Sequence, residues 1–264
     1  MFDSLAPVLR RDRLVVVVAL AVVVVLSWAY VVVGAGTGTP ASQMSALPTA
    51  LHINDPMGAM VPIRWTPGYA LLMFVMWWLM MLATMLPSAA PMILLFAALI
   101  RNQHGSPAPY VGTGLFAAGY LAVWAGFSIP AVALQWQLSR LALLSPMMVT
   151  TSTALGSMLL LAAGVWQFTP LKHVCLRHCR APAEFLTLHW RKGQGGAVLM
   201  GILHGAYCLG CCWMLMLLLF YGGIMNIYWI AGLTTLVFVE KLAPFGSWVS
   251  GFIGAGFILA GLSL

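Results

Sequence analysis

The chain has 264 residues, of which 62% are hydrophobic and 6% charged, and its mean hydropathy is +0.98. A soluble domain averages about 25% charged residues, so this chain cannot cover a water-facing surface, and a polytopic membrane protein in contact with the lipid bilayer is predicted. The net charge of +7 sits in short clusters beside hydrophobic stretches, which indicates orientation in a membrane and excludes nucleic acid as the expected partner.

Hydrophobic stretches predict an all-α transmembrane bundle of six or seven spans, forming a single domain over 1–264. The spans are expected near 14–34, 69–100, 110–138, 146–168, 195–223, 224–239 and 242–264. Whether the stretch 242–264 crosses the membrane decides between six and seven spans. The second is interrupted by Pro87 and Pro91, and one long kinked helix is the simplest interpretation.

Positive residues set the expected orientation. Arg10, Arg11 and Arg13 precede the first span, and the segment 169–194 carries five Lys or Arg residues against one Glu. Because cytoplasmic segments are enriched in Lys and Arg, the N-terminus and this basic loop are predicted inside, and the loop 35–68 outside. The first stretch is interpreted as a retained helix, because its apolar run is too long for a typical signal peptide.

The stretch HGAYCLGCCW places three of the chain's five cysteines close to a histidine inside the fifth predicted span. At about 100° per residue, His204, Cys208, Cys211 and Cys212 fall on one stripe covering about a third of the helix. Thiolate and imidazole suit Cu(I) or Zn(II), and a thiolate in lipid is costly unless a cation neutralises it. The stripe therefore predicts a metal site, with simple packing of small apolar cysteines as the alternative.

Methionines are concentrated in the second predicted span. They form two stripes, the first made of Met73, Met76 and Met80 and the second of Met81, Met85 and Met92. A thioether is a soft ligand that favours Cu(I) over zinc, although methionine is also an adaptable core filler. On the assumption that the two helices face each other, we expect four methionines to assist the cysteine stripe, namely Met76, Met80, Met81 and Met85.

A second constellation lies in the basic segment 169–194. Cys175 and Cys179 are four residues apart, and His178 adjoins Cys179, so a helix here would point both thiols the same way. The metal interpretation is a docking or transfer site at the cytoplasmic face. A reactive thiol pair and a cationic interfacial segment with incidental cysteines are the alternatives.

Two further polar segments give weaker signals. Glu240 and Lys241 are expected to pair with each other at a helix end, in a structural role. The segment HINDPMGAM in the outside loop has side chains able to capture an ion, although a polar turn is the favoured interpretation. Its metal-capable residues are His52, Asp55, Met57 and Met60.

Five segments together resemble the bacterial family of predicted metal-binding integral membrane proteins, a domain of unknown function sometimes labelled copper chaperone. They are MWWLMMLATMLPSAAPM (76–92), FTPLKHVCLRHCRAP (168–182), HGAYCLGCCW (204–213), GGIMNIYWIAG (222–232) and VEKLAPFG (239–246). The resemblance implies a multi-pass helical protein of the bacterial inner membrane that binds a metal. It does not identify the metal.

These observations favour a non-enzymatic protein that transports, stores or delivers Cu(I), with zinc as the alternative ion and a metal donor or acceptor protein as the expected partner. The sequence has no nucleotide-binding loop and no phosphorylated-Asp pump motif, so a primary pump is not expected. Two alternatives stay open. One is a membrane thiol–disulfide oxidoreductase that uses Cys208 with Cys211, and the other is a structural subunit of a larger membrane complex.

Overall fold

The computed structural model describes residues 5–36, 65–102, 109–145 and 148–264. This part of the chain is helical, and its only β-pairing is the isolated bridge between Leu144 and Thr150. The helices are α1 (Leu5–Val32), α3 (Pro67–Asn102), α4 (Pro109–Arg140), α5 (Thr153–Gln167), α6 (Pro170–Arg180), α7 (Pro182–His189), α8 (Gly193–Leu217), α9 (Leu219–Gly222), α10 (Ile227–Leu242) and α11 (Gly246–Ser263). The predicted all-α class is therefore confirmed.

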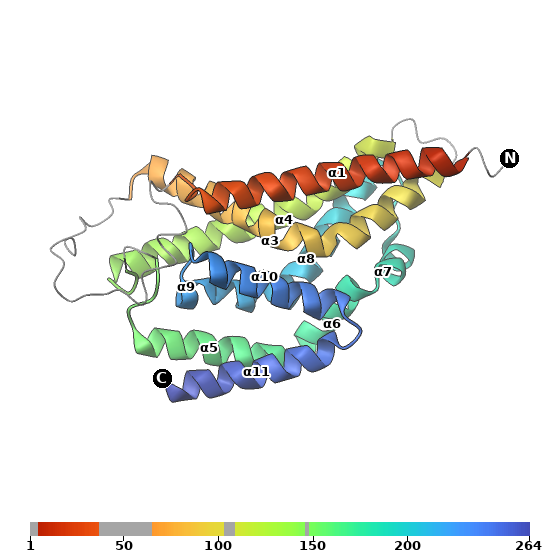
Figure 1. The fold of residues 1–264 in the computed structure, drawn as a ribbon. Helices are drawn as coiled ribbons and strands as arrows, with labels where there is room; N and C mark the ends of the chain where they lie inside the picture. The colour runs from red at the N-terminus through yellow and green to blue at the C-terminus, as the bar shows by residue number, and fades with distance from the viewer. Residues whose placement is uncertain (1–4, 37–64, 103–108, 146–147) are drawn as a thin grey trace.

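The helices form a bundle around α3, α4 and α8 (Figure 1). Helix α1 packs against α3 on one side, while α5 and α11 lie side by side on the opposite side. Helix α10 contacts α3, α8 and α11, and α6 packs along α8. This arrangement brings parts of the chain that are far apart in the sequence, α3, α8 and α10, to one place.

The described helices support fewer spans than the six or seven expected. Four helices are long and apolar enough to cross a membrane, and the bent pair α5 and α6, which meet at 64°, would make a fifth. The expected span 146–168 is helical only from Thr153 to Gln167, because Ser152 caps the helix and Thr150 pairs with Leu144 in the isolated bridge. Helices α10 and α11, of 16 and 18 residues, are shorter than these four.

Helix α3 runs without a break through Pro87 and Pro91, so the prediction of one long helix is confirmed. Proline has no N–H to donate to the carbonyl four residues earlier. The carbonyl of Ala83, which Pro87 cannot reach with a hydrogen bond, instead accepts one from the indole of Trp28 on α1 at 3.1 Å. The proline therefore frees an acceptor that links α1 to α3.

Small residues allow α4 and α8 to pack backbone against backbone. A Cβ added at Gly201 would collide with the carbonyl oxygen of Phe116, and one at Gly119 with that of Val198. At Gly205 a Cβ would lie 3.0 Å from the side chain of Val123. This close approach is typical of helix contacts between small residues in membranes, and it fixes where the α8 side chains point.

Replacing Gly201 with alanine is expected to lower the stability of the bundle by at least about 1–3 kcal/mol, because the clash is with backbone that cannot rotate away. The matched control is Gly126→Ala in α4, where an added Cβ meets nothing within 4 Å. That variant should be neutral or slightly stabilising, because alanine favours helix over glycine. Thermal unfolding in detergent compares the two, and equal midpoints would contradict the packing argument.

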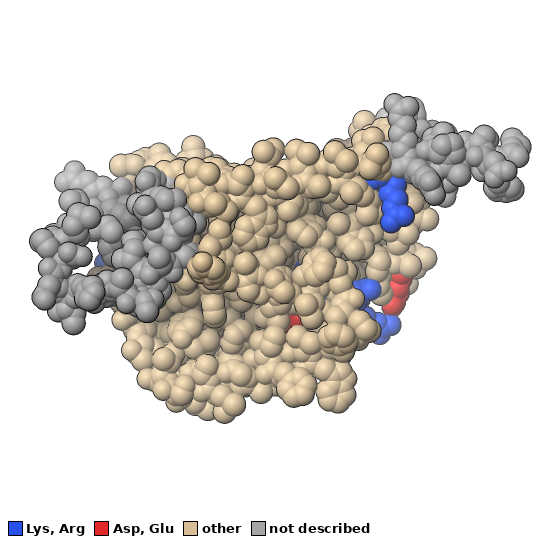
Figure 2. All heavy atoms as spheres, viewed as in Figure 1, with Lys and Arg blue, Asp and Glu red and all other residues tan. Residues whose placement is uncertain are grey.

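The segment 169–194, expected as a basic inside loop, folds into α6 and α7. Thr169 caps α6 by accepting a hydrogen bond from the backbone of Lys172 at 3.3 Å, and Pro170 occupies the first turn. Pro182 then starts α7. On the face shown in Figure 2, most charged side chains gather at the end where α6 and α7 lie, whereas the rest is largely uncharged.

Candidate metal site

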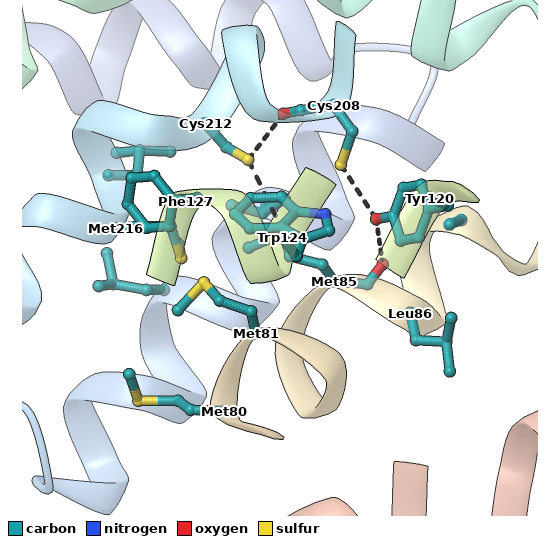
Figure 3. Packing of buried hydrophobic residues seen from close by; sticks show 14 of the residues in the cluster. Met80, Met81, Met85, Leu86, Tyr120, Trp124, Phe127, Cys208, Cys212 and Met216 are labelled. Carbon is teal, nitrogen blue, oxygen red and sulfur yellow. Dashed lines mark hydrogen bonds between the residues drawn. The ribbon is translucent and has the colours of Figure 1, made fainter. Parts of the chain in front are cut away.

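The predicted stripe of α8 is buried inside the bundle. Its side chains are almost fully shielded, with exposed fractions of 3% for His204 and 1% each for Cys208, Cys211 and Cys212. Figure 3 shows Cys208 and Cys212 extending from α8 toward α3 and α4. The stripe therefore faces protein, and its chemistry depends on the groups that α3, α4 and α10 place against it.

One methionine of α3 reaches a cysteine of α8. The Sγ atom of Cys212 lies 3.7 Å from the Sδ atom of Met85. The other three methionines expected to assist, Met76, Met80 and Met81, are fully buried in the same core, but among the described residues no hydrogen bond joins them to a cysteine thiol. The two helices thus face each other at Met85, and the sulfur pair forms there.

Cys208 lies in a hydrogen-bond network that joins four helices. Its Sγ atom is 3.1 Å from the hydroxyl of Tyr120 on α4 and accepts a hydrogen bond from the ammonium of Lys241 on α10 at 3.0 Å. Lys241 also donates to Ser88 on α3 at 3.1 Å. Ser88 donates to the carbonyl of Met85 at 2.9 Å. The Tyr120 hydroxyl lies 3.2 Å from the same carbonyl and can donate its one proton either to it or to the Cys208 sulfur (Figure 3). As a thiolate, Cys208 would neutralise the buried charge of Lys241.

The expectation that Glu240 pairs with Lys241 is wrong. Glu240 pairs with Lys172 of α6 at 2.9 Å and accepts a hydrogen bond from Ser250 of α11 at 2.9 Å. Consecutive residues on a helix point about 100° apart and do not face each other, so the two charges belong to different neighbours. The consequence is that Lys241 is free to contact the Cys208 thiol.

His204 occupies an aromatic cage with an unsatisfied nitrogen. Its ring lies 5.7 Å from that of Tyr120, 6.2 Å from Phe116 and 5.5 Å from Phe185. Its Nδ1 atom is buried and has no hydrogen-bond partner among the described residues. Such an atom costs about 1–3 kcal/mol, so this nitrogen is a candidate to bind something that the protein does not itself supply.

Helix α6 brings its cysteines to the cysteine stripe of α8, whereas its His178 contacts a different α8 residue. Cys175 packs against Gly210, where an added Cβ would lie 2.6 Å from its sulfur. The Cys179 thiol interacts with the thiols of Cys208 and Cys211. His178 instead stacks on Tyr207, with ring centroids 4.1 Å apart. The i, i+4 cysteines of α6 therefore extend the α8 cluster and do not form a separate site at the surface.

The thiols do not form a ready-made coordination shell. Within the described ranges, no three His, Cys, Asp or Glu side chains are grouped so as to hold a metal ion. The reason is local, because Cys211 and Cys212 both donate to the carbonyl of Cys208, at 3.1 and 2.9 Å, while Cys208 faces Tyr120 and Lys241. All five cysteines are free thiols. Rotation of these side chains would be needed to gather several sulfurs on one ion.

The sequence did not predict the part that three residues take in this site. Ser88 and Tyr120 were not identified, and Lys241 was not expected to contact a thiol. A lysine near the end of an apolar stretch was a usable signal, because a buried ammonium needs a partner. Nothing in the sequence distinguished Tyr120 or Ser88. The predicted ion-capturing segment with His52, Asp55, Met57 and Met60 lies outside the described residues.

Comparison with known proteins gives one finding. A family model described as copper chaperone (PpoB2) matches residues 74–264, which contain the whole α8 stripe, both α6 cysteines and Met85. No curated protein and no solved structure matches the chain.

Proposed function

The chain belongs to the copper chaperone family, whose model covers residues 74–264, and we propose that it carries Cu(I) as cargo in a bacterial inner membrane and delivers it to an acceptor protein. The proposed binding place is the buried sulfur site, defined as Met85, Cys208, Cys211 and Cys212, with the partly exposed Cys179 at its edge. We propose that the protein has no catalytic activity of its own.

The observation that carries this proposal is the contact between Cys212 and Met85. A thiol and a thioether from helices separated by 127 positions in the sequence lie 3.7 Å apart in a fully buried place. Thiolate and thioether ligands select Cu(I), whereas zinc sites use thiolate, imidazole and carboxylate. The methionine therefore supports Cu(I) over zinc at this position.

Two further features fit a cationic cargo. The unsatisfied Nδ1 of His204, one helical turn from Cys208, supplies a neutral ligand already aimed into the interior. Lys241 supplies the positive charge that a thiolate needs when no metal is present. A metal ion that replaced the ammonium beside Cys208 would keep this buried region neutral, which matters because an unpaired charge in a membrane is costly.

The proposed orientation follows the positive residues. With the N-terminus and the basic segment of α6 and α7 at the cytoplasmic face, the charged end seen in Figure 2 would be the cytoplasmic end. Cys179, at the junction of α6 with α8, would be the first thiol that an ion from this side meets.

The test is Cu(I) and Zn(II) titration of the anaerobically purified full chain in competition with a chelator of known affinity. The expected result is binding that is far tighter for Cu(I) than for Zn(II), with sulfur ligands visible by X-ray absorption. Thiol counting of protein from oxidised membranes should give five free cysteines. No Cu(I) binding would overturn the proposal, and a Cys208–Cys211 disulfide would favour the oxidoreductase.

A further inference from the structure

We propose that His178 of α6 and His189 of α7 form a second Cu(I) site, outside the buried sulfur site, at which the ion is exchanged with a partner. The inference deepens the proposed function and rests on it for the identity of the ion. The evidence is the geometry of the two imidazoles. They lie on different helices, and the break between α6 and α7 brings them together.

Both rings are held in the tautomer that leaves Nε2 as the nitrogen able to bind a metal. The Nδ1 of His178 bonds to the carbonyl of Val174 at 2.9 Å, and that of His189 to the carbonyl of Phe185 at 3.1 Å. A carbonyl can only accept, so each Nδ1 carries the proton and each neutral ring presents the lone pair of Nε2. A backbone carbonyl on one ring nitrogen is the usual arrangement around a metal-binding histidine.

The two rings have a separation that suits one shared ion. Their centroids are 6.2 Å apart and the ring planes meet at 68°. With a metal–nitrogen bond of about 2.0 Å, two imidazoles on opposite sides of one ion have centres about 6 Å apart. Both side chains are partly exposed, so an ion or a donor protein can reach them, unlike the thiols of α8.

Aromatic neighbours fix the rings and connect them to the interior. Tyr207 of α8 stacks on His178 with centroids 4.1 Å apart and planes within 3°. Phe185 stacks on His189 with ring centroids 4.8 Å apart, and the Phe185 ring also lies 5.5 Å from the ring of His204. The pair therefore adjoins the cage of His204, whose unsatisfied nitrogen is the next available ligand toward Cys208.

The positively charged side chains of α6 already bind other groups of the protein. Arg177 pairs with Glu184 at 2.9 Å, and Arg180 donates to the carbonyls of Ala243 and Pro244. Lys172 is buried against Glu240. The guanidinium and ammonium groups of α6 thus have anionic or carbonyl partners, which reduces their repulsion of a cation at the two imidazoles.

The experiment measures Cu(I) stoichiometry, affinity and loading rate for the full chain and for the double variant His178→Gln/His189→Gln. His173→Gln is the matched control, because His173 also bonds through Nδ1 to a helix carbonyl, that of Thr169 at 2.8 Å, and lies exposed on α6. The double variant should lose a weaker, nitrogen-coordinated Cu(I), load the tight site at least about tenfold more slowly, and keep the affinity of the tight site. The control should match the wild-type chain.

Failure of this inference is distinguishable from failure of the proposed function. Repeating the titration in a Cys208→Ser/Cys212→Ser background removes the tight site and leaves the imidazole pair. The inference is wrong if the His178→Gln/His189→Gln variant still binds the weaker, nitrogen-coordinated Cu(I) and loads the tight site at the wild-type rate. This conclusion holds whether or not the cysteines bind Cu(I). If His173→Gln has the same effect as the double variant, surface histidines in general bind the ion and the inference is overturned.

Discussion

Replacing Cys208 and Cys212 together with serine is expected to weaken Cu(I) binding by more than about 100-fold. Serine is close to cysteine in size, and at position 208 its hydroxyl can still hydrogen-bond with Tyr120 and Lys241, but it is a hard ligand that Cu(I) does not favour. Loss of an outer-shell partner alone costs about 10–100-fold in metal affinity, so loss of two sulfur ligands should cost more. Competition with a Cu(I) chelator measures the change.

Methionine variants make this result specific. Met85→Leu removes the sulfur in contact with Cys212 while keeping the volume, so Cu(I) affinity should fall and stability should change by less than about 1.5 kcal/mol. Met92→Leu is the matched control, because Met92 is equally buried on α3 and lies two turns further along the helix. Equal losses of affinity at Met85 and Met92 would show that the thioether is core packing. Unchanged affinity in the serine variant would place the ion elsewhere.

Periodicity predicted the parts of this site that lie on a single helix. The α8 stripe of His204, Cys208, Cys211 and Cys212 follows from 100° per residue, and the structure buries all four. The small residues Gly205 and Gly210 beside the stripe mark the places where α4 and α6 approach. In the same way, the uninterrupted apolar run predicted α3 as one helix through two prolines.

Residues supplied by other helices were beyond a one-dimensional pattern. Which methionine meets a thiol depends on the crossing of α3 with α8, and Met85 is the one that lies against Cys212. Tyr120 was one aromatic residue among many in an apolar stretch. Adjacency in the sequence was misleading for Glu240 and Lys241, because a helix turns neighbours away from each other. The basic segment was expected to be a loop because of its high positive charge. The helix-capping signal at Thr169 was a better guide to its structure.

Breaking the buried pair of Lys172 and Glu240 is expected to be the most destabilising change among the charged residues. Both side chains are at most 2% exposed, and Lys172 also donates to Gln167. Lys172→Met leaves the carboxylate of Glu240 uncompensated in an apolar interior, which should lower the free energy of unfolding by about 3–5 kcal/mol. The double variant Lys172→Met/Glu240→Gln has no buried charge and should recover most of this loss.

The exposed pair of Arg177 and Glu184 supplies the matched control for the buried one. It has the same 2.9 Å separation, but its side chains are 73% and 46% exposed, so Arg177→Met should change stability by no more than about 1 kcal/mol. Denaturant unfolding in detergent micelles compares all three variants. Equal effects of Lys172→Met and Arg177→Met would mean that water reaches Glu240. Because Glu240 holds α10 to α6 and α11, Lys172→Met should also disturb the placement of Lys241 against Cys208 and weaken Cu(I) binding, whereas Arg177→Met should leave that binding unchanged.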